Sequence, residues 1–222
     1  MKKIARWTVK YPLAYAIIFV LIYFTWFHLL EVNVSPRIIL HSRIDDMIPF
    51  CKYFVISYYM WFAFIAGFTA YFLFKSPKDY QNVTRYMFTG MILALTIYTI
   101  LPNGLDLRPQ LTDTDLFTHI ITMLYRSDTP TNVCPSLHVY NSLAMTAVIC
   151  RSEAFGRNRK VKIFAIILCI FIILSTLFIK QHSIIDVFFG AVMALVLYPL
   201  AKRSYIISDD EEDIAREGLK EQ

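Results

Sequence analysis

Charged residues are scarce in this chain, and a polar helix face is missing from much of it. Charged residues make up 18% of the 222 residues, whereas hydrophobic residues make up 57%. This composition is typical of a membrane protein. A soluble all-helical domain is excluded because three long apolar runs, 12–30, 49–74 and 161–179, have no polar face.

Metal-binding and nucleic-acid motifs are also absent. The four cysteines do not have metal-ligand spacing; Cys51 and Cys134 fall near one face of the membrane and could pair in a disulfide, while Cys150 and Cys169 belong to helices. The net charge of +5 comes from basic residues scattered among loops. We therefore expect no metal, no cofactor and no nucleic-acid partner, and the sequence indicates no obligatory protein partner. The expected partner of these basic loop residues is the lipid bilayer.

Six apolar runs are long enough, or nearly long enough, to cross a hydrocarbon core, which takes about 20 residues. They cover residues 12–30, 49–74, 86–101, 136–150, 161–179 and 183–201. The third, fourth and sixth are short and depend on neighbouring helices or tilt. The sequence predicts an all-α polytopic membrane protein with six transmembrane helices in one bundle, formed by residues 1–203. Residues 204–222 are predicted to be an acidic cytoplasmic tail.

The placement of lysine and arginine predicts the orientation of these spans. One side collects Lys2, Lys3, Arg6, Lys10, Lys75, Lys78, Arg85, Arg151, Arg157, Arg159, Lys160, Lys162, Lys202 and Arg203. The other side holds Arg37, Arg43, Lys52, Arg108, Arg126 and Lys180. Because cytoplasmic loops carry the excess of positive charge, both termini are expected to be cytoplasmic. The compact loops favour a bacterial cytoplasmic membrane.

Two outer connections differ in character. The loop 31–48 is expected to be solvated and to contain a surface helix. The connection 102–135 is longer, and within it residues 114–125 place apolar side chains on one face and polar ones on the other. The apolar set is Leu116, Phe117, Ile120, Ile121 and Leu124. We expect an interfacial amphipathic helix here, in the outer loop before span four, with His119 on its wet face.

Two short segments concentrate the chemistry on the outer side. The first runs from Cys134 to His138 and opens span four; the second runs from Lys180 to Asp186 and opens span six. Asp186 follows His182 by four residues, so the two side chains are expected to share one helix face. Ionisable groups inside or at the edge of a membrane span indicate a functional site.

These residue types fit transfer of a phosphoryl group. A carboxylate at Asp186 that binds one ring nitrogen of His182 leaves the other nitrogen free as a nucleophile. His138 can donate a proton to the leaving alkoxide. The helix start at Ser136 attracts anions, and Arg108 and Lys180 supply positive charge for a phosphate.

Two other interpretations of the same residues stay open. The two histidines and the aspartate could bind a divalent metal as a facial triad, although Arg108 and Lys180 would repel a cation. The histidines could also be interfacial residues without a chemical role.

The pattern Pro135-Ser136-Leu137-His138, followed by His182 and Asp186, resembles the second and third motifs of the type-2 phosphatidic acid phosphatase superfamily. That superfamily includes lipid phosphatases, undecaprenyl-diphosphate phosphatases and, with a Pro-Ser-Leu-His variant, transferases similar to inositol-phosphorylceramide synthase. The resemblance covers the outer half of the spans from about residue 101 to 190. It implies that His182 forms a phosphohistidine, Asp186 orients it, and His138 is the general acid.

The resemblance also implies that Ser136 and Arg108 contact the phosphoryl oxygens, but two family cations are missing from this sequence. The lysine seven residues before the family's Arg-Pro pair is Leu101 here, and the family's Ser-Arg before the second histidine is Ser175-Thr176. Lys180 and Arg126 are the candidates to replace them.

We therefore expect a metal-independent membrane enzyme that hydrolyses a lipid phosphate monoester or polyprenyl diphosphate at the extracytoplasmic face. The alternative within enzymes is a phosphotransferase that moves a phosphorylated head group to a lipid alcohol. From another class, the chain could be a transporter or a non-catalytic scaffold.

Overall fold

The computed structural model describes residues 11–202, so the basic segment 1–10 and the acidic run 209–213 lie outside the described residues. The elements in chain order are α2 (Pro12–Asn33), β1 (Ile38–Leu40), α3 (Arg43–Met47), the 3-10 turn η1 (Lys52–Phe54), α4 (Val55–Lys75), α5 (Pro77–Ile100), β2 (Asn103–Leu105), α6 (Leu116–Ser127), α7 (Leu137–Arg151), α8 (Arg159–Phe178) and α9 (Ile184–Lys202). Each of the six apolar runs forms a helix.

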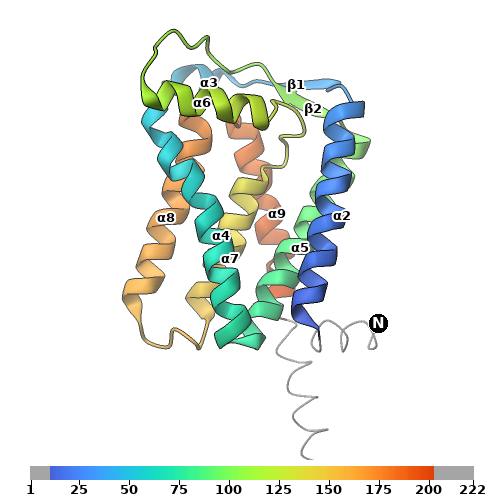
Figure 1. Ribbon diagram of the computed structural model, residues 1–222, viewed down its shortest axis with the longest axis vertical. Coiled ribbons are helices and arrows are strands. Elements are labelled where there is room, and N and C mark those ends of the chain that lie inside the picture. The colour runs from blue at the N-terminus through green and yellow to red at the C-terminus, as the bar shows by residue number, and fades with distance from the viewer. Residues whose placement is uncertain (1–10, 203–222) are drawn as a thin grey trace, which may run out of the picture.

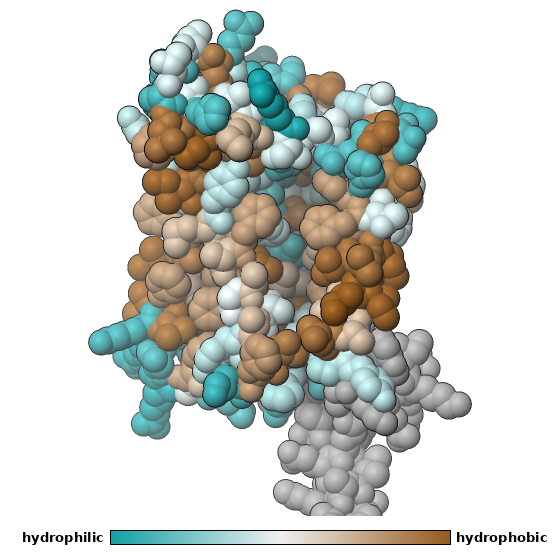
Figure 2. All heavy atoms as spheres, viewed as in Figure 1, coloured by the Kyte–Doolittle hydropathy of each residue, from teal (hydrophilic) through white to brown (hydrophobic). Residues whose placement is uncertain are grey.

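The long helices run along one common axis and form a single bundle (Figure 1). One end of the bundle carries α3, α6 and the two strands, while α2 begins and α9 ends at the opposite end (Figure 1). An apolar band separates the more polar ends of the face shown in Figure 2. Within residues 11–202, five helical segments are long and apolar enough to cross a membrane: α2, η1 with α4, α5, α8 and α9.

The remaining expected span, α7, is the central helix of the bundle. It contacts α4, α5, α8 and α9. Its 15 residues extend only about 22 Å at 1.5 Å per residue, which is less than the ~30 Å hydrocarbon core. A helix surrounded by protein has little need of a fully apolar surface, and α7 buries Asn141 and Ser142. The count of six spans therefore stays a prediction.

The end of the bundle that carries α3 and α6 contains structure that the sequence did not indicate. Strands β1 and β2 pair in parallel, with Ile38 opposite Asn103, so the all-α expectation holds for the bundle but misses this two-stranded sheet. Helix α6 forms in the connection before α7 but begins two residues later than expected, and its interfacial position stays a prediction; its buried residues are Thr118, Ile121 and Leu124. Leu116 is 68% exposed, because the buried residues of α6 recur every three positions from Thr118 and Leu116 is not among them. All four cysteines are free thiols.

Glycine permits close packing between α5 and α7. A Cβ atom at Gly90 would overlap the ring of Tyr140. That ring is fully buried, and its hydroxyl donates to the carbonyl of Tyr86 at 2.5 Å, so it has little freedom to move aside. The α5–α7 contact therefore depends on the absence of a side chain at this position.

We predict that Gly90→Ala lowers stability by about 1–3 kcal/mol, the usual range for overpacking a core. Alanine normally favours a helix over glycine by roughly 0.5–1 kcal/mol, so the sign of the effect identifies the clash. The matched control is Gly67→Ala in α4, where a new Cβ meets no atom within 4 Å. Thermal unfolding in detergent should show a lower midpoint for Gly90→Ala only; equal midpoints for the two variants would contradict the packing.

Candidate active site

The loop that leads into α7 is fixed on several sides. The Asn103 side chain accepts from the amides of Val133 (2.9 Å) and Cys134 (2.8 Å) and donates to the Cys134 carbonyl (3.0 Å). The Tyr98 hydroxyl donates to the carbonyl of Pro135 at 2.6 Å. Ser136 is fully buried and its hydroxyl caps α7 by accepting from the Val139 amide at 3.3 Å. His138 is therefore presented from a rigid helix start.

The turn between α8 and α9 places the second histidine. The amides of Gln181 and His182 both donate to the carbonyl of Thr176, at 2.9 and 3.0 Å. The spacing of His182 and Asp186 had suggested that both lie on one helix face. Helix α9 begins only at Ile184, however, so His182 lies in the turn before the helix. Asp186 instead reaches back from the first turn, and one of its oxygens accepts from the Ser183 amide at 3.0 Å.

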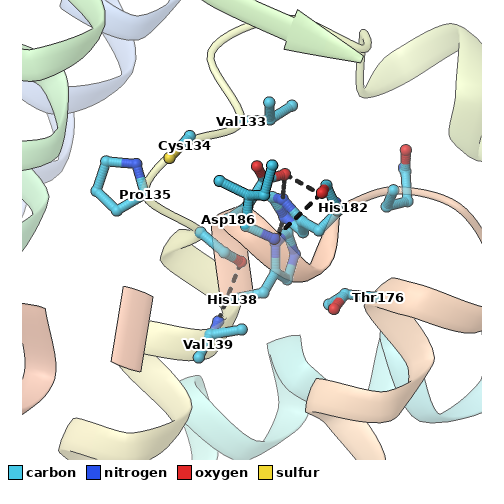
Figure 3. A network of polar contacts seen from close by, with 12 residues as sticks. Val133, Cys134, Pro135, His138, Val139, Thr176, His182 and Asp186 are labelled. Atoms are coloured by element: carbon cyan, nitrogen blue, oxygen red, sulfur yellow. Dashed lines mark hydrogen bonds and ion pairs between the residues drawn. The ribbon is translucent and has the colours of Figure 1, made fainter. Parts of the chain in front are cut away.

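The two segments bring both histidines and the aspartate together (Figure 3). Nδ1 of His182 lies 3.2 Å from Oδ2 of Asp186, and Nε2 of His182 lies 3.5 Å from Nδ1 of His138. The carboxylate assigns the proton of His182 to Nδ1. The lone pair on Nε2 therefore faces the other imidazole.

Helix α4 provides an aromatic wall for this pair. The ring of His138 lies 4.5 Å from the ring of Tyr58 and 4.5 Å from that of Trp61, measured between centroids. Within the described part of the chain, Nε2 of His138 and Oδ1 of Asp186 are buried without a hydrogen-bond partner. No motif or local spacing in the sequence linked Tyr58 and Trp61 to the site.

A close approach of α9 to α7 sets the distance between the histidines. The Ser136 amide donates to the carbonyl of Asp186 at 3.1 Å. One turn further on, a Cβ at Gly190 would lie 2.7 Å from the Ser136 carbonyl oxygen. The small residue allows the backbones to meet at the level of the site.

Arg108, an expected phosphate ligand, is held close to the site by acceptors of the protein. Its guanidinium donates to the carbonyls of Tyr125 (2.9 Å) and Asp128 (2.5 Å) and to the side chain of Gln181. Its Nε is buried without a partner among residues 11–202. Burial lowers the pKa of Arg108 from its ordinary value, although a guanidinium stays protonated at neutral pH. Arg108 therefore contacts Gln181, the residue directly before His182.

Asp128 and Gln181 complete a polar network that the sequence did not reveal. The Asp128 carboxylate accepts from the hydroxyl of Tyr58 at 2.5 Å and from the side-chain NH₂ group of Gln181 at 3.2 Å. The network thus connects Arg108 with the aromatic wall of His138.

The other two expected cations lie in different settings. The ammonium of Lys180 donates to the carbonyls of Asp45 and Ile48, both at 2.6 Å. Arg126 is exposed on α6, and its side chain has no hydrogen bond or ion pair with residues 11–202. Their role as phosphate ligands stays a prediction. Across this same range, no group of three or more His, Cys, Asp or Glu side chains could hold a metal ion.

An apolar groove of about 460 Å³ begins beside the loop before α7. Cys134 and Pro135 line it at the outer end, and α5 and α9 form its walls. The wall residues include Leu93, Ile97, Val192 and Met193. Leu101, which occupies the place of a family lysine, also lines this groove.

Comparison with known families agrees with the geometry. Residues 83–206 match the PAP2 superfamily, and this range contains both histidines, Asp186, Arg108 and Ser136. The chain belongs to the PAP2 superfamily. It is therefore a membrane protein of the phosphatase or phosphotransferase type, as the two motifs suggested. The searches found no match among curated proteins and none among solved structures.

The PAP2 match begins within α5, so α2, α3 and α4 precede it. Tyr58 and Trp61 thus come from a part of the chain that the family match does not cover. The aromatic wall is a contribution of this chain's own amino-terminal half.

Cys134 offers a test of the electrostatics of the PAP2 site. Burial, and secondarily the charge of Asp186, raises the pKa of the Cys134 thiol from 9.0 to about 12. The thiolate is the form that reacts, so at pH 8 alkylation by iodoacetamide should be about a thousandfold slower in the folded protein than in the same protein unfolded in SDS. Mass spectrometry of the Cys134 peptide measures both rates, with Cys134→Ser as the assignment control. Similar rates in the two states would contradict the buried, anionic surroundings.

Proposed function

We propose that this PAP2 protein is a lipid phosphatase that works through a phosphohistidine at His182. The observation that carries the proposal is the arrangement of three groups. Asp186 holds Nδ1 of His182, and Nε2 then faces the ring of His138 at 3.5 Å. One imidazole can act as nucleophile and the other as proton donor.

The reaction follows from this arrangement. Nε2 of His182 attacks phosphorus, an N–P bond forms, and the P–O bond to the lipid alcohol breaks as His138 donates a proton to the leaving oxygen. His138 then accepts a proton from water, whose oxygen attacks phosphorus; the N–P bond breaks and inorganic phosphate leaves. A phosphoryl group on Nε2 needs the space now filled by the neighbouring ring, so the two rings must part when substrate binds.

In this scheme, cationic side chains and the N-terminus of α7 stabilise the negative charge that develops on the phosphoryl group. Ser136 caps the start of α7, where the first backbone N–H groups of the helix, at Leu137 and His138, can bind an anion. Arg108 can exchange its bond to Gln181 for a phosphoryl oxygen, because both are acceptors for the same guanidinium. Lys180 and Arg126 are further candidates. No metal ion is needed for charge neutralisation in this scheme.

The apolar groove supports a lipid as substrate. It starts at Pro135, directly before the Ser136–His138 segment, and continues between the membrane-crossing helices α5 and α9. A hydrocarbon chain is the complementary occupant of such a surface. With both termini in the cytoplasm, the site faces the extracytoplasmic side of the membrane, which we take to be a bacterial cytoplasmic membrane.

The central prediction concerns activity. The purified protein should release phosphate from lipid phosphates in the presence of EDTA and be inhibited by vanadate. His182→Ala and His138→Ala should each lower kcat by at least about 100-fold. His119→Ala is the matched control, because His119 is exposed on α6, and its activity should equal that of the wild type.

The other interpretations predict different outcomes of this assay. Phosphate release only after a lipid alcohol is added would favour the transferase, and activity restored by a divalent metal after EDTA would favour the metal triad. Absence of turnover with every lipid phosphate, together with uptake that survives His182→Ala, would favour a transporter.

The groove yields a separate prediction. Val192→Trp should fill part of the groove and raise KM for a long-chain lipid phosphate several-fold, while a short-chain analogue should be affected little. Leu195→Trp on the same helix is the control, since Leu195 is 76% exposed and does not line the groove. Equal effects of Val192→Trp on both chain lengths would show that the lipid tail lies elsewhere.

A further inference from the structure

One carboxylate in the outer loop is buried although its neighbours are exposed. Asp45 on α3 is 1% exposed, whereas Ile44 is 53% exposed and Met47 is 81% exposed. The loop 31–48 was expected to be solvated, so this burial corrects that expectation. A buried carboxylate is costly unless hydrogen bonds compensate its lost hydration.

The compensating bonds come from the turn between α8 and α9 that carries His182, which we call the catalytic turn. Oδ2 of Asp45 accepts from the hydroxyl of Ser183 at 2.6 Å, and Oδ1 accepts from the amide of Ile184 at 2.8 Å. A third bond, from the Ser42 amide at 2.9 Å, closes a capping box within α3. Asp45 thus connects a helix of the outer loop to the two residues that follow His182.

These bonds complete the start of α9. The first amides of a helix have no partner within the helix. Here the Ser183 amide donates to Asp186, the Ile184 amide donates to Asp45, and the Ile185 amide donates to the Ser183 hydroxyl at 3.1 Å. Two carboxylates at a helix N-terminus are also favoured by the helix dipole.

Lys180 ties the other side of His182 to the same segment. Its ammonium donates to the carbonyl oxygens of Asp45 and Ile48, and its backbone has a positive φ of 55°, a conformation that surrounding contacts must maintain. The residues on both sides of His182 are therefore attached to one short stretch of the outer loop, which lies outside the family match.

We infer that Asp45 is a positioning residue for His182. It fixes the turn that carries the imidazole, so that Nδ1 stays on Asp186 and Nε2 stays against His138. This inference rests on the proposed function and adds a residue from the amino-terminal half to its machinery.

The test compares Asp45→Ala and Asp45→Asn with Asp46→Ala. Asp46 is the adjacent residue on α3, but its carboxylate contacts His41 and not the catalytic turn. Asp45→Ala should lower kcat about 10- to 100-fold with KM within about twofold, because a small displacement of a reacting group has such effects. Asp45→Asn should retain more activity, since its amide oxygen can still accept from Ile184. Asp46→Ala should behave as wild type.

A double-mutant cycle shows whether Asp45 acts through the turn. Ser183→Ala and Asp45→Ala combined should lower kcat by less than the product of the two single effects, because both remove the same bond. A multiplicative result, or a kcat for Asp45→Ala equal to that of Asp46→Ala, would overturn the inference.

A spectroscopic readout separates this inference from the proposed function. The chain has five histidines, so the ¹⁵N ring resonances of His182 can be assigned with His182→Ala. Asp45→Asn, which preserves the shape of the side chain, should move these resonances, and Asp46→Ala should leave them in place. If the wild type hydrolyses no lipid phosphate, the proposed function fails while this spectrum still decides on Asp45; unmoved His182 resonances would refute the positioning role.

Discussion

The contact between the starts of α7 and α9 is the constraint on which the site depends. Neither histidine lies near the other in sequence, and their meeting requires the two helix ends to touch. Gly190 permits this approach, and the bond from the Ser136 amide to the Asp186 carbonyl fixes its register. A Cβ at Gly190 would lie 2.7 Å from the Ser136 carbonyl oxygen, so a larger residue there would push the two backbones apart.

Much of the fold could be predicted from apolar runs, but buried polar pairs could not. The expected span 86–101 begins nine residues earlier, at Pro77, because the polar first turns of α5 are buried as well. The Asp79 carboxylate accepts from the hydroxyls of Ser76 (2.7 Å) and Ser152 (2.6 Å). A hydropathy profile predicts that such polar residues are exposed, because it contains no information about a partner such as Ser152, which is 73 positions from Asp79.

The candidate site likewise contains some residues that local sequence patterns indicate and others that they do not. His182 and Asp186 are four residues apart, and a helix start marks His138, so local spacing was enough to select them. Asp45 meets Ile184 across 139 positions, and Tyr58 meets Asp128 across 70. Only the Ser42-to-Asp45 capping box gave a local signal for Asp45, and that signal predicts a helix start and no distant contact. Long-range partners of this kind follow from packing and have no pattern in the sequence.

In the proposed reaction, these long-range bonds offer a way for the site to work with fewer of the family's cations. Lys180 and Asp45 hold the catalytic turn from outside, and the Arg108 network holds it from the α6 side through Gln181. A nucleophile that is held in place on both sides loses little freedom when it reacts, and positioning alone can supply several kcal/mol of a reaction barrier. In the proposed reaction the basic side chains therefore contribute by fixing the imidazole as well as by attracting phosphate. On this proposal Asp45 of α3 and the aromatic wall of α4, which the family match does not include, belong to the active site together with the two histidine motifs.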